Sequence, residues 1–165
     1  MVNTRFVRKE DWKAVMSLYN AWRTEDGSSA VRDSILSLKQ AKKRIVQILK
    51  SKNGFGLVAE QKGKIVGFIE ANQGGFVKTH HSMFVNDIII FKEHRRKGFG
   101  QALINRIIKI TKQKKLKLIY LFVASNNKPA IKFYLTCGFK KTGRIIKGYK
   151  FGNKYVDKNI MCKLL

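Results

Sequence analysis

The sequence predicts an α+β fold, in which a mixed, mostly antiparallel central sheet is flanked by helices. Residues 55–60 and 64–71 have the composition of an antiparallel hairpin around a polar turn. Residues 82–91 form a central strand, which leads through a loop with two glycines into apolar residues at helical spacing. Residues 140–147 and 154–164 have the composition of two terminal strands.

The first half of the chain opens with a short strand over residues 3–8. Apolar residues at helical spacing then predict a helix over residues 12–22. A second helix is expected to begin at Ser28 or Ser29, either of which could cap it, and to end near Lys50.

The second half continues with a strand over residues 118–124 and a helix that follows Asn127. A turn from Gly148 to Asn153 is expected to join the two terminal strands. The chain shows no internal repeat or linker, so residues 1–165 are expected to form a single domain.

The loop after the central strand has the features of an anion-binding site. Its basic residues, Arg95 to Lys97, are followed by Gly98 and Gly100 and then by the first helical turn. Glycines allow close approach of the backbone, and the unpaired N–H groups of a first turn supply donors. The pattern is not a P-loop, which requires G-x-x-x-x-G-K-[ST]. It is not a Rossmann fingerprint, G-x-G-x-x-G, because Leu103 stands at the position of the third glycine.

Two motifs resemble the signatures of the GNAT family of N-acetyltransferases. The first is Arg95-x-x-Gly98-x-Gly100, directly after a β-like run. The second, one strand and one helix downstream, is Asn127-x-x-Ala130-x-x-x-Tyr134-x-x-x-Gly138-Phe139. The resemblance covers residues 55–165 well and the first 50 residues loosely. It implies a sheet that splays at an acetyl-CoA site.

The resemblance also implies which residues bind acetyl-CoA. The loop would hold the pyrophosphate, and main-chain groups of the splayed strand would bind the pantetheine arm, with the Ile90 N–H as oxyanion donor. The full set of implied cofactor residues is Ile88, Ile89, Ile90, Arg95, Arg96, Lys97, Gly98, Phe99, Gly100, Asn127 and Tyr134.

Tyr134 corresponds to the family's usual general acid, which protonates the CoA sulfur. The alternative is that it only packs on the sheet. Asn127 is expected to contact the cofactor, to cap its helix, or to do both. The general base stays open between Asp87, Glu70 and a mechanism that uses water or no base. The family's polyamine-acetylating members often carry an acidic pair where this chain has Asn86-Asp87, so the first acid is replaced.

The charge balance is strongly basic, since 35 Lys and Arg against 10 Asp and Glu leave a net charge of +25. This excess favours a polyanionic partner, although a lysine-rich composition can also reflect codon usage. Without a secretory signal, a membrane-spanning run or a disulfide framework, a cytoplasmic location is expected. No metal site is expected, because neither His80-His81 nor the two cysteines have zinc-ligand spacing.

Three functions remain open from the sequence. The first is acetyl transfer from acetyl-CoA to a small amine, such as a polyamine or an amino acid derivative. The second is the same reaction on a protein N-terminus or lysine, and the third is a non-catalytic basic module that binds CoA or nucleic acid. A homodimer through the terminal strands, common in the family, is left open.

Overall fold

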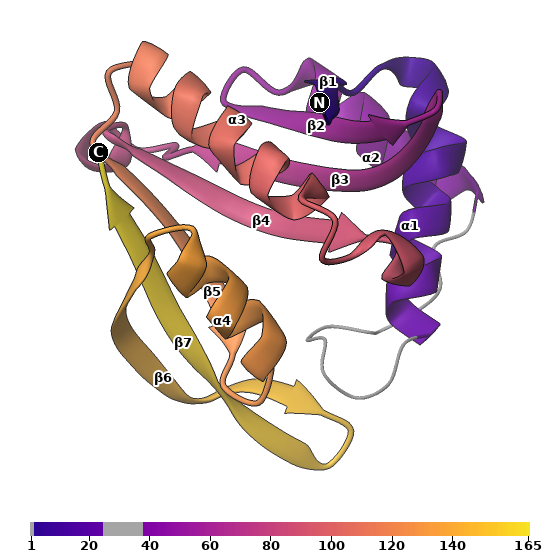
Figure 1. The fold of residues 1–165 in the computed structure, drawn as a ribbon. Helices are drawn as coiled ribbons and strands as arrows, with labels where there is room; N and C mark the ends of the chain where they lie inside the picture. Colours follow the sequence, from indigo (N-terminus) through magenta and orange to yellow (C-terminus); the bar gives the residue numbers. More distant parts are fainter. Residues whose placement is uncertain (1, 25–37) are drawn as a thin grey trace.

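The computed structural model describes residues 2–24 and 38–165, and its α+β architecture agrees with the prediction (Figure 1). The described strands form one mixed, open sheet in the order β1-β2-β3-β4-β5-β7-β6. Their bounds are β1 Asn3–Phe6, β2 Gly54–Gln61, β3 Lys64–Gln73, β4 Ser82–Ile90, β5 Leu118–Ala124, β6 Lys140–Phe151 and β7 Lys154–Leu164. The described α-helices are α1 Trp12–Thr24, α2 Leu38–Lys50, α3 Phe99–Gln113 and α4 Lys128–Thr136.

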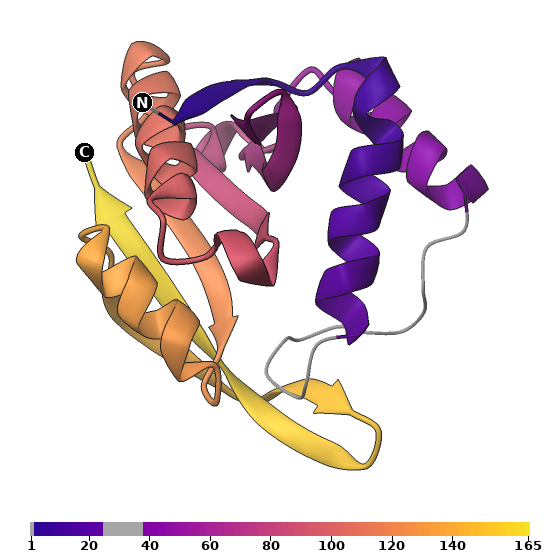
Figure 2. The same ribbon diagram turned by 45° about the vertical axis from the view of Figure 1, so that its right-hand side comes forward.

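The helices cover both faces of the sheet, and each face has its own apolar core (Figure 2). On one face α1 and α2 pack on β2 to β4 through residues such as Leu18, Ile45 and Phe68. On the other face α3 and α4 lie over the sheet, and Leu103 and Ile107 are fully buried there. The second core is the larger one, and it runs from β2 across the sheet to β7.

The centre of the sheet contains a short parallel seam. β4 and β5 pair in parallel only from Ser82 opposite Leu118 to Val85 opposite Leu121. Beyond this point β4 continues to Ile90 along β3, while β5 continues along β7. The sheet therefore splays between β4 and β5, as the sequence resemblance predicted.

Most predicted elements are observed within one or two residues. The hairpin is β2 and β3, the strand over residues 118–124 is β5, and the strand over residues 154–164 is β7. The expected cap of the second helix at Ser28 or Ser29 lies outside the described residues. In the described part of the chain, no helix is long and apolar enough to cross a membrane.

The predicted turn from Gly148 to Asn153 is wrong. β6 continues to Phe151, and the turn is confined to two residues, with Gly152 at a φ of 55°. Gly148 instead belongs to an irregular part of the ladder, where the register with β7 shifts between Ile145 and Tyr149. A Cβ at Gly148 would lie 2.6 Å from the Cβ of Lys158, so this glycine permits close strand contact rather than a chain reversal.

Candidate active site

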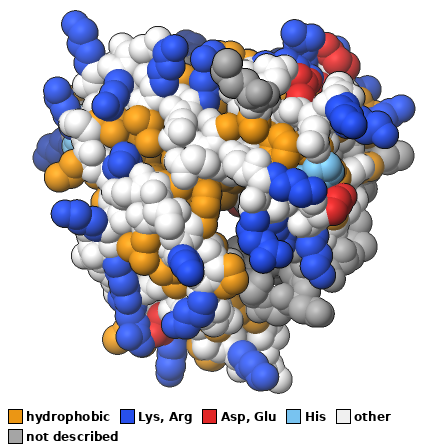
Figure 3. Space-filling model, viewed as in Figure 1, with side chains coloured by type: hydrophobic (Ala, Val, Ile, Leu, Met, Phe, Trp, Pro, Cys, Tyr) orange, Lys and Arg blue, Asp and Glu red, His pale blue; other side chains and the backbone are white. Residues whose placement is uncertain are grey.

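The loop between β4 and α3 curls tightly, and its basic side chains point to solvent. The segment Lys92–His94 forms a 3-10 turn, and Gly98 caps α3 with a φ of 85°. Arg96 has a φ of 59°, a conformation that is costly for a residue with a side chain. Figure 3 shows Lys and Arg side chains gathered at this loop, beside a hydrophobic strip between α3 and α4.

The two glycines of the loop have different surroundings. A Cβ at Gly98 would meet no atom within 4 Å, so the space in front of the loop is open. At Gly100 an added Cβ would lie 3.1 Å from the ring of Phe133 on α4, which sets how closely α3 and α4 approach. The N-terminal N–H groups of α3 therefore face a space that an anion can enter.

The edge of β4 that faces the seam carries main-chain groups without a strand partner. The Phe91 N–H donates to Val66 O of β3 at 3.1 Å. Because peptide groups alternate along a strand, the N–H and C=O of Ile90 point to the opposite side, toward the splay. The Arg95 Nε donates to Ile90 O at 3.0 Å, which ties the basic loop to the end of β4.

The helix α4 brings two motif residues to the other side of the seam. The Asn127 Oδ1 accepts from the Ala130 N–H at 3.2 Å, so Asn127 caps the helix. Tyr134 is buried, with its ring centroid 5.8 Å from that of Phe139. Burial, reinforced by the charge of Asp87, raises the pKa of Tyr134 above its ordinary value. The phenol is therefore protonated at neutral pH.

The two candidate bases are neighbours, because Glu70 on β3 pairs with Asp87 on β4. Both carboxylates bind Arg44 of α2, at 2.7 Å and 3.1 Å from its Nη2 atom. The Tyr19 hydroxyl donates to Asp87 at 2.8 Å. Asn86, which replaces the first acid of the family's pair, donates to Glu70 at 3.1 Å.

Contacts between Arg44, Tyr19, Glu70 and Asp87 shift the pKa values of Arg44 and Tyr19. Burial disfavours the cation on Arg44, but Tyr19, Glu70 and Asp87 together raise its pKa above the ordinary value. Burial and the charge of Asp87 raise the pKa of Tyr19, so its hydroxyl stays a donor. The Nε atom of Arg44 is buried and has no hydrogen-bond partner in the described part of the chain.

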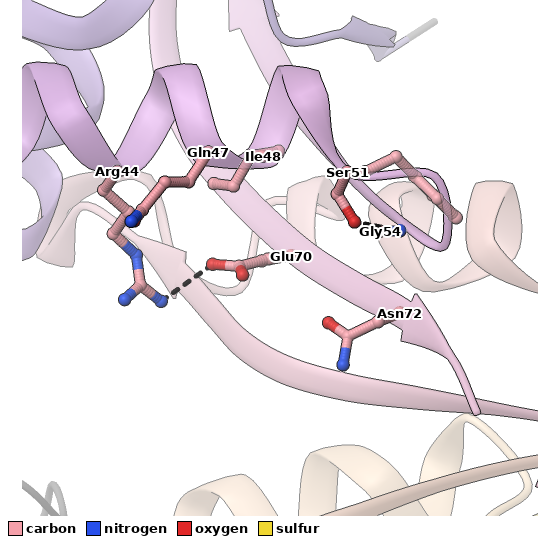
Figure 4. Close-up of a pocket in the computed structure, with 8 residues that line it drawn as sticks. Arg44, Gln47, Ile48, Ser51, Gly54, Glu70 and Asn72 are labelled. Atoms are coloured by element: carbon pink, nitrogen blue, oxygen red, sulfur yellow. Dashed lines mark hydrogen bonds and ion pairs between the residues drawn. The ribbon is translucent and has the colours of Figure 1, made fainter. Parts of the chain in front are cut away.

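A pocket of about 200 Å³ adjoins the acidic cluster, between α2 and the strands β2 and β3 (Figure 4). Its polar lining includes Arg44, which a dashed line joins to Glu70 in Figure 4, together with Gln47 of α2 and Asn72 of β3. The pocket thus extends the site away from the seam, on the side of the sheet that α1 and α2 cover.

The structure brings most of the sequence-derived candidates to the two sides of the seam. Ile90 ends β4, and the loop residues connect it to the start of α3. Asn127 caps α4, which carries Tyr134. Glu70 on β3 and Asp87 on β4 are paired neighbours. Two candidates are placed differently. The side chain of Phe99 is buried in the larger core, and Ile89 packs in the smaller core, with its carbonyl directed toward Gly67 of β3.

Arg44 and Tyr19 were missed by the sequence reasoning. Tyr19 lies within residues 12–22, where the helical spacing of apolar residues gives no sign of a polar role. Arg44 lies one residue before Ile45 and four before Ile48, both buried, so its position beside the apolar face of α2 was the one available signal.

The comparison with known proteins identifies the family. Residues 12–139 match the model of the Acetyltransferase (GNAT) family. The chain belongs to this family. The spermidine N(1)-acetyltransferase of Vibrio cholerae is 30% identical over 102 residues, which are 61% of this chain and 57% of that protein. The N-alpha-acetyltransferase of Sulfurisphaera tokodaii is 32% identical over 115 residues, covering 63% of this chain and 66% of that protein.

The solved structures agree on the fold. A GNAT superfamily phosphinothricin acetyltransferase from Sinorhizobium meliloti, in complex with acetyl-CoA, has a TM-score of 0.86 at 16% identity, covering 99% of this chain and 88% of that one. At this identity the likeness shows the fold alone. The chain spans between 44% and 66% of the length of three curated relatives that it matches.

The residues present fit acetyl-CoA, the cosubstrate that the family implies. The open space before Gly98, the N–H groups of α3 and the three consecutive cations of the loop suit a pyrophosphate. The unpaired edge of β4 suits an amide-containing arm, since extended chains bind to free strand edges through main-chain hydrogen bonds.

Proposed function

We propose that this GNAT domain is an acetyl-CoA-dependent N-acetyltransferase that acylates a primary amine. The observation that supports this is the meeting of four features at one seam. An anion-binding loop and a free strand edge lie on one side, a buried protonated phenol lies on the other, and two paired carboxylates lie on β3 and β4. A merely structural seam would need none of these groups together.

The binding roles follow from position. Arg95, Arg96 and Lys97, with the main chain from Gly98 to Gly100, hold the pyrophosphate. The main-chain groups of Ile88 and Ile90 face the splay and orient the acyl donor, with the Ile90 N–H directed at the oxygen that becomes negative. Ile89 lies between these two residues and packs in the smaller core, so it helps to fix the position of β4.

The proton-handling roles fall to the groups around Asp87. The thioester supplies the acyl group, and its transfer replaces a C–S bond by a C–N bond. Tyr134 gives its proton to the sulfur as the C–S bond breaks, since its buried phenol is protonated at neutral pH. Asp87 or Glu70, directly or through water, takes the proton that the amine loses.

The acceptor is a small-molecule amine, such as a polyamine or an amino acid derivative, in the leading form of this proposal. A protein N-terminus or lysine is the second candidate, which the likeness to an N-alpha-acetyltransferase supports as much as the likeness to a spermidine acetyltransferase supports the first. A cytoplasmic location, a homodimer and a polyanionic partner for the +25 charge stay predictions.

The test is thiol release from acetyl-CoA across a panel of amines and N-terminal peptides, with Tyr134→Phe alongside. We expect one acceptor class to turn over, and Tyr134→Phe to lower kcat by about 100-fold, the size expected for a general acid. Tyr155→Phe, on the exposed tip of β7, is the matched control and should leave kcat unchanged. Full activity in Tyr134→Phe would refute the assigned role, and failure to bind CoA by calorimetry would refute the proposed function itself.

A further inference from the structure

The acidic cluster is partly neutralised by the protein itself. Glu70 and Asp87 carry two negative charges, and Arg44 contacts both of them through a single nitrogen. The guanidinium also lies over the ring of Tyr19, at 5.1 Å, which holds it in place. An acceptor with several ammonium groups needs carboxylates that are not already paired. At this cluster such an acceptor would be repelled by Arg44, which already contacts both carboxylates.

A strip of aromatic rings continues from the cluster across the sheet. Asn72, which accepts from Asn86 at 2.6 Å, is paired in register with Phe84. The ring of Phe84 lies 4.9 Å from Tyr120 and 5.2 Å from Phe122. These residues share one face of β4 and β5, and all three rings are partly exposed. The strip offers an uncharged floor for the body of a ligand.

A second cation stands at the far end of this strip. The Lys158 Nζ lies 5.2 Å from the ring centroid of Phe122 and 4.5 Å from that of Tyr149. Tyr149 is close enough to Asp87 for that carboxylate to add to the rise that burial causes in the tyrosine pKa. Through its contact with Phe122, Lys158 lies at the end of the aromatic strip opposite the acidic cluster, where it adds a positive charge.

The net charge of the whole molecule also disfavours polycationic acceptors. A net charge of +25 repels polycations and attracts anions before any contact is made. An acceptor with three or four positive charges would lose association rate, and beside Arg44 it would find an excess of only one negative charge in the cluster.

We propose that the acceptor of this site is an amine that also carries an anionic group, such as an amino acid or another amino carboxylate, and that Arg44 and Lys158 select it over polyamines. This inference rests on the proposed acetyltransferase function and names its substrate class. The reacting amine lies beside Asp87, the uncharged body lies on the strip from Phe84 to Phe122, and the anionic group is held by Lys158.

The test uses three acceptors of equal length that differ only in the charge of the tail. They are ε-aminocaproate, hexylamine and hexamethylenediamine, whose tails are negative, neutral and positive, and the series is repeated with shorter chains. We expect kcat/KM to fall in that order, with about tenfold or more between the anionic and the cationic member, as expected when a charge-assisted hydrogen bond is lost. The difference should appear mainly in KM.

Variants assign the effect to its source. Lys158→Gln should raise KM for ε-aminocaproate by about tenfold while leaving hexylamine unchanged, and Lys158→Glu should reverse the preference toward hexamethylenediamine. Lys154→Gln, an exposed lysine at the start of β7, is the matched control. Arg44→Gln should raise kcat/KM for hexamethylenediamine. If Arg44→Gln folds poorly, the two Lys158 variants still test the inference.

The outcomes separate the two proposals. A preference for hexamethylenediamine or spermidine in the unmodified protein, or an anion preference that survives in Lys158→Gln and Arg44→Gln, overturns this inference but leaves acetyl transfer intact. If none of the acceptors turns over, calorimetry on the CoA-saturated protein gives the same comparison, and equal or weaker binding of ε-aminocaproate overturns the inference. Absence of CoA binding refutes the underlying function instead.

Discussion

Two glycines with the same backbone strain allow the anion-binding role of the loop to be tested. Gly98 before α3 has a φ of 85°, and Gly63 in the β2–β3 turn has a φ of 75°. An added Cβ would meet no atom within 4 Å at either position. Alanine at each site therefore adds no clash, and the cost is confined to the left-handed backbone, about 1–2 kcal/mol.

Gly98→Ala and Gly63→Ala should lose the same stability. For a chain of this size the cost corresponds to a fall in Tm of about 2–8 °C, which thermal melting of the CoA-free proteins can measure. The two variants should differ in ligand affinity. In Gly98→Ala the new methyl group occupies the open space before the α3 N–H groups, so the Kd for CoA should rise by about tenfold or more, equal to 1.4 kcal/mol or more.

Calorimetric titration with CoA decides the question, with Gly63→Ala as the control for backbone strain. The reasoning fails if Gly98→Ala binds CoA as well as the unmodified protein does. It also fails if Gly63→Ala loses as much affinity, because the loss would then follow from general destabilisation and not from the loop.

Two further predictions concern stability. Burial opposes the charge of Asp11, but the Arg5 guanidinium and the Arg8 N–H hold the pKa of that carboxyl below its ordinary value. The contribution of Asp11 to the free energy of unfolding is therefore present above about pH 4 and is lost as the pH falls through the lower folded-state pKa. Asp11→Asn should cost about 1.5 kcal/mol of stability at pH 7, and the stability measured by urea unfolding should then fall less steeply at acid pH. An unchanged pH profile would contradict this. Ile107→Ala removes a fully buried side chain between α3 and the sheet and should cost about 2–5 kcal/mol in urea unfolding, whereas Lys109→Ala on the exposed side should change stability by less than about 0.5 kcal/mol. Equal effects of the two helix variants would contradict the packing.

The elements that could be predicted from the sequence are those with a strong local signal. β5 is an unbroken apolar and aromatic run, and the β2–β3 hairpin surrounds a glycine turn, so both were located within a residue or two. The strand–loop–helix at Gly98 was likewise visible, because its glycines and basic residues are contiguous. Gly148 was misread because a glycine that permits close contact between strands looks, in sequence, like one that reverses the chain.

The acidic cluster could be predicted only in part. Asp87 and Glu70 were found as acids on strands beside the expected site, but their shared partner was not. Arg44 is 26 residues from Glu70 and 43 from Asp87, and it belongs to a different element. Neither periodicity nor a local motif indicates an ion pair of this kind, which depends on how α2 docks on the sheet.

The short pairing between β4 and β5 has a mechanical consequence. The sheet consists of two parts, one of β1 to β4 and one of β5, β7 and β6, whose strands pair with each other at only four residue pairs. The apolar core under α3 and α4 extends across both parts of the sheet. A molecule bound along the free edge of β4 and against α4 would add contacts across this short junction, so we expect occupancy of the site to be coupled to the angle between the two parts of the sheet.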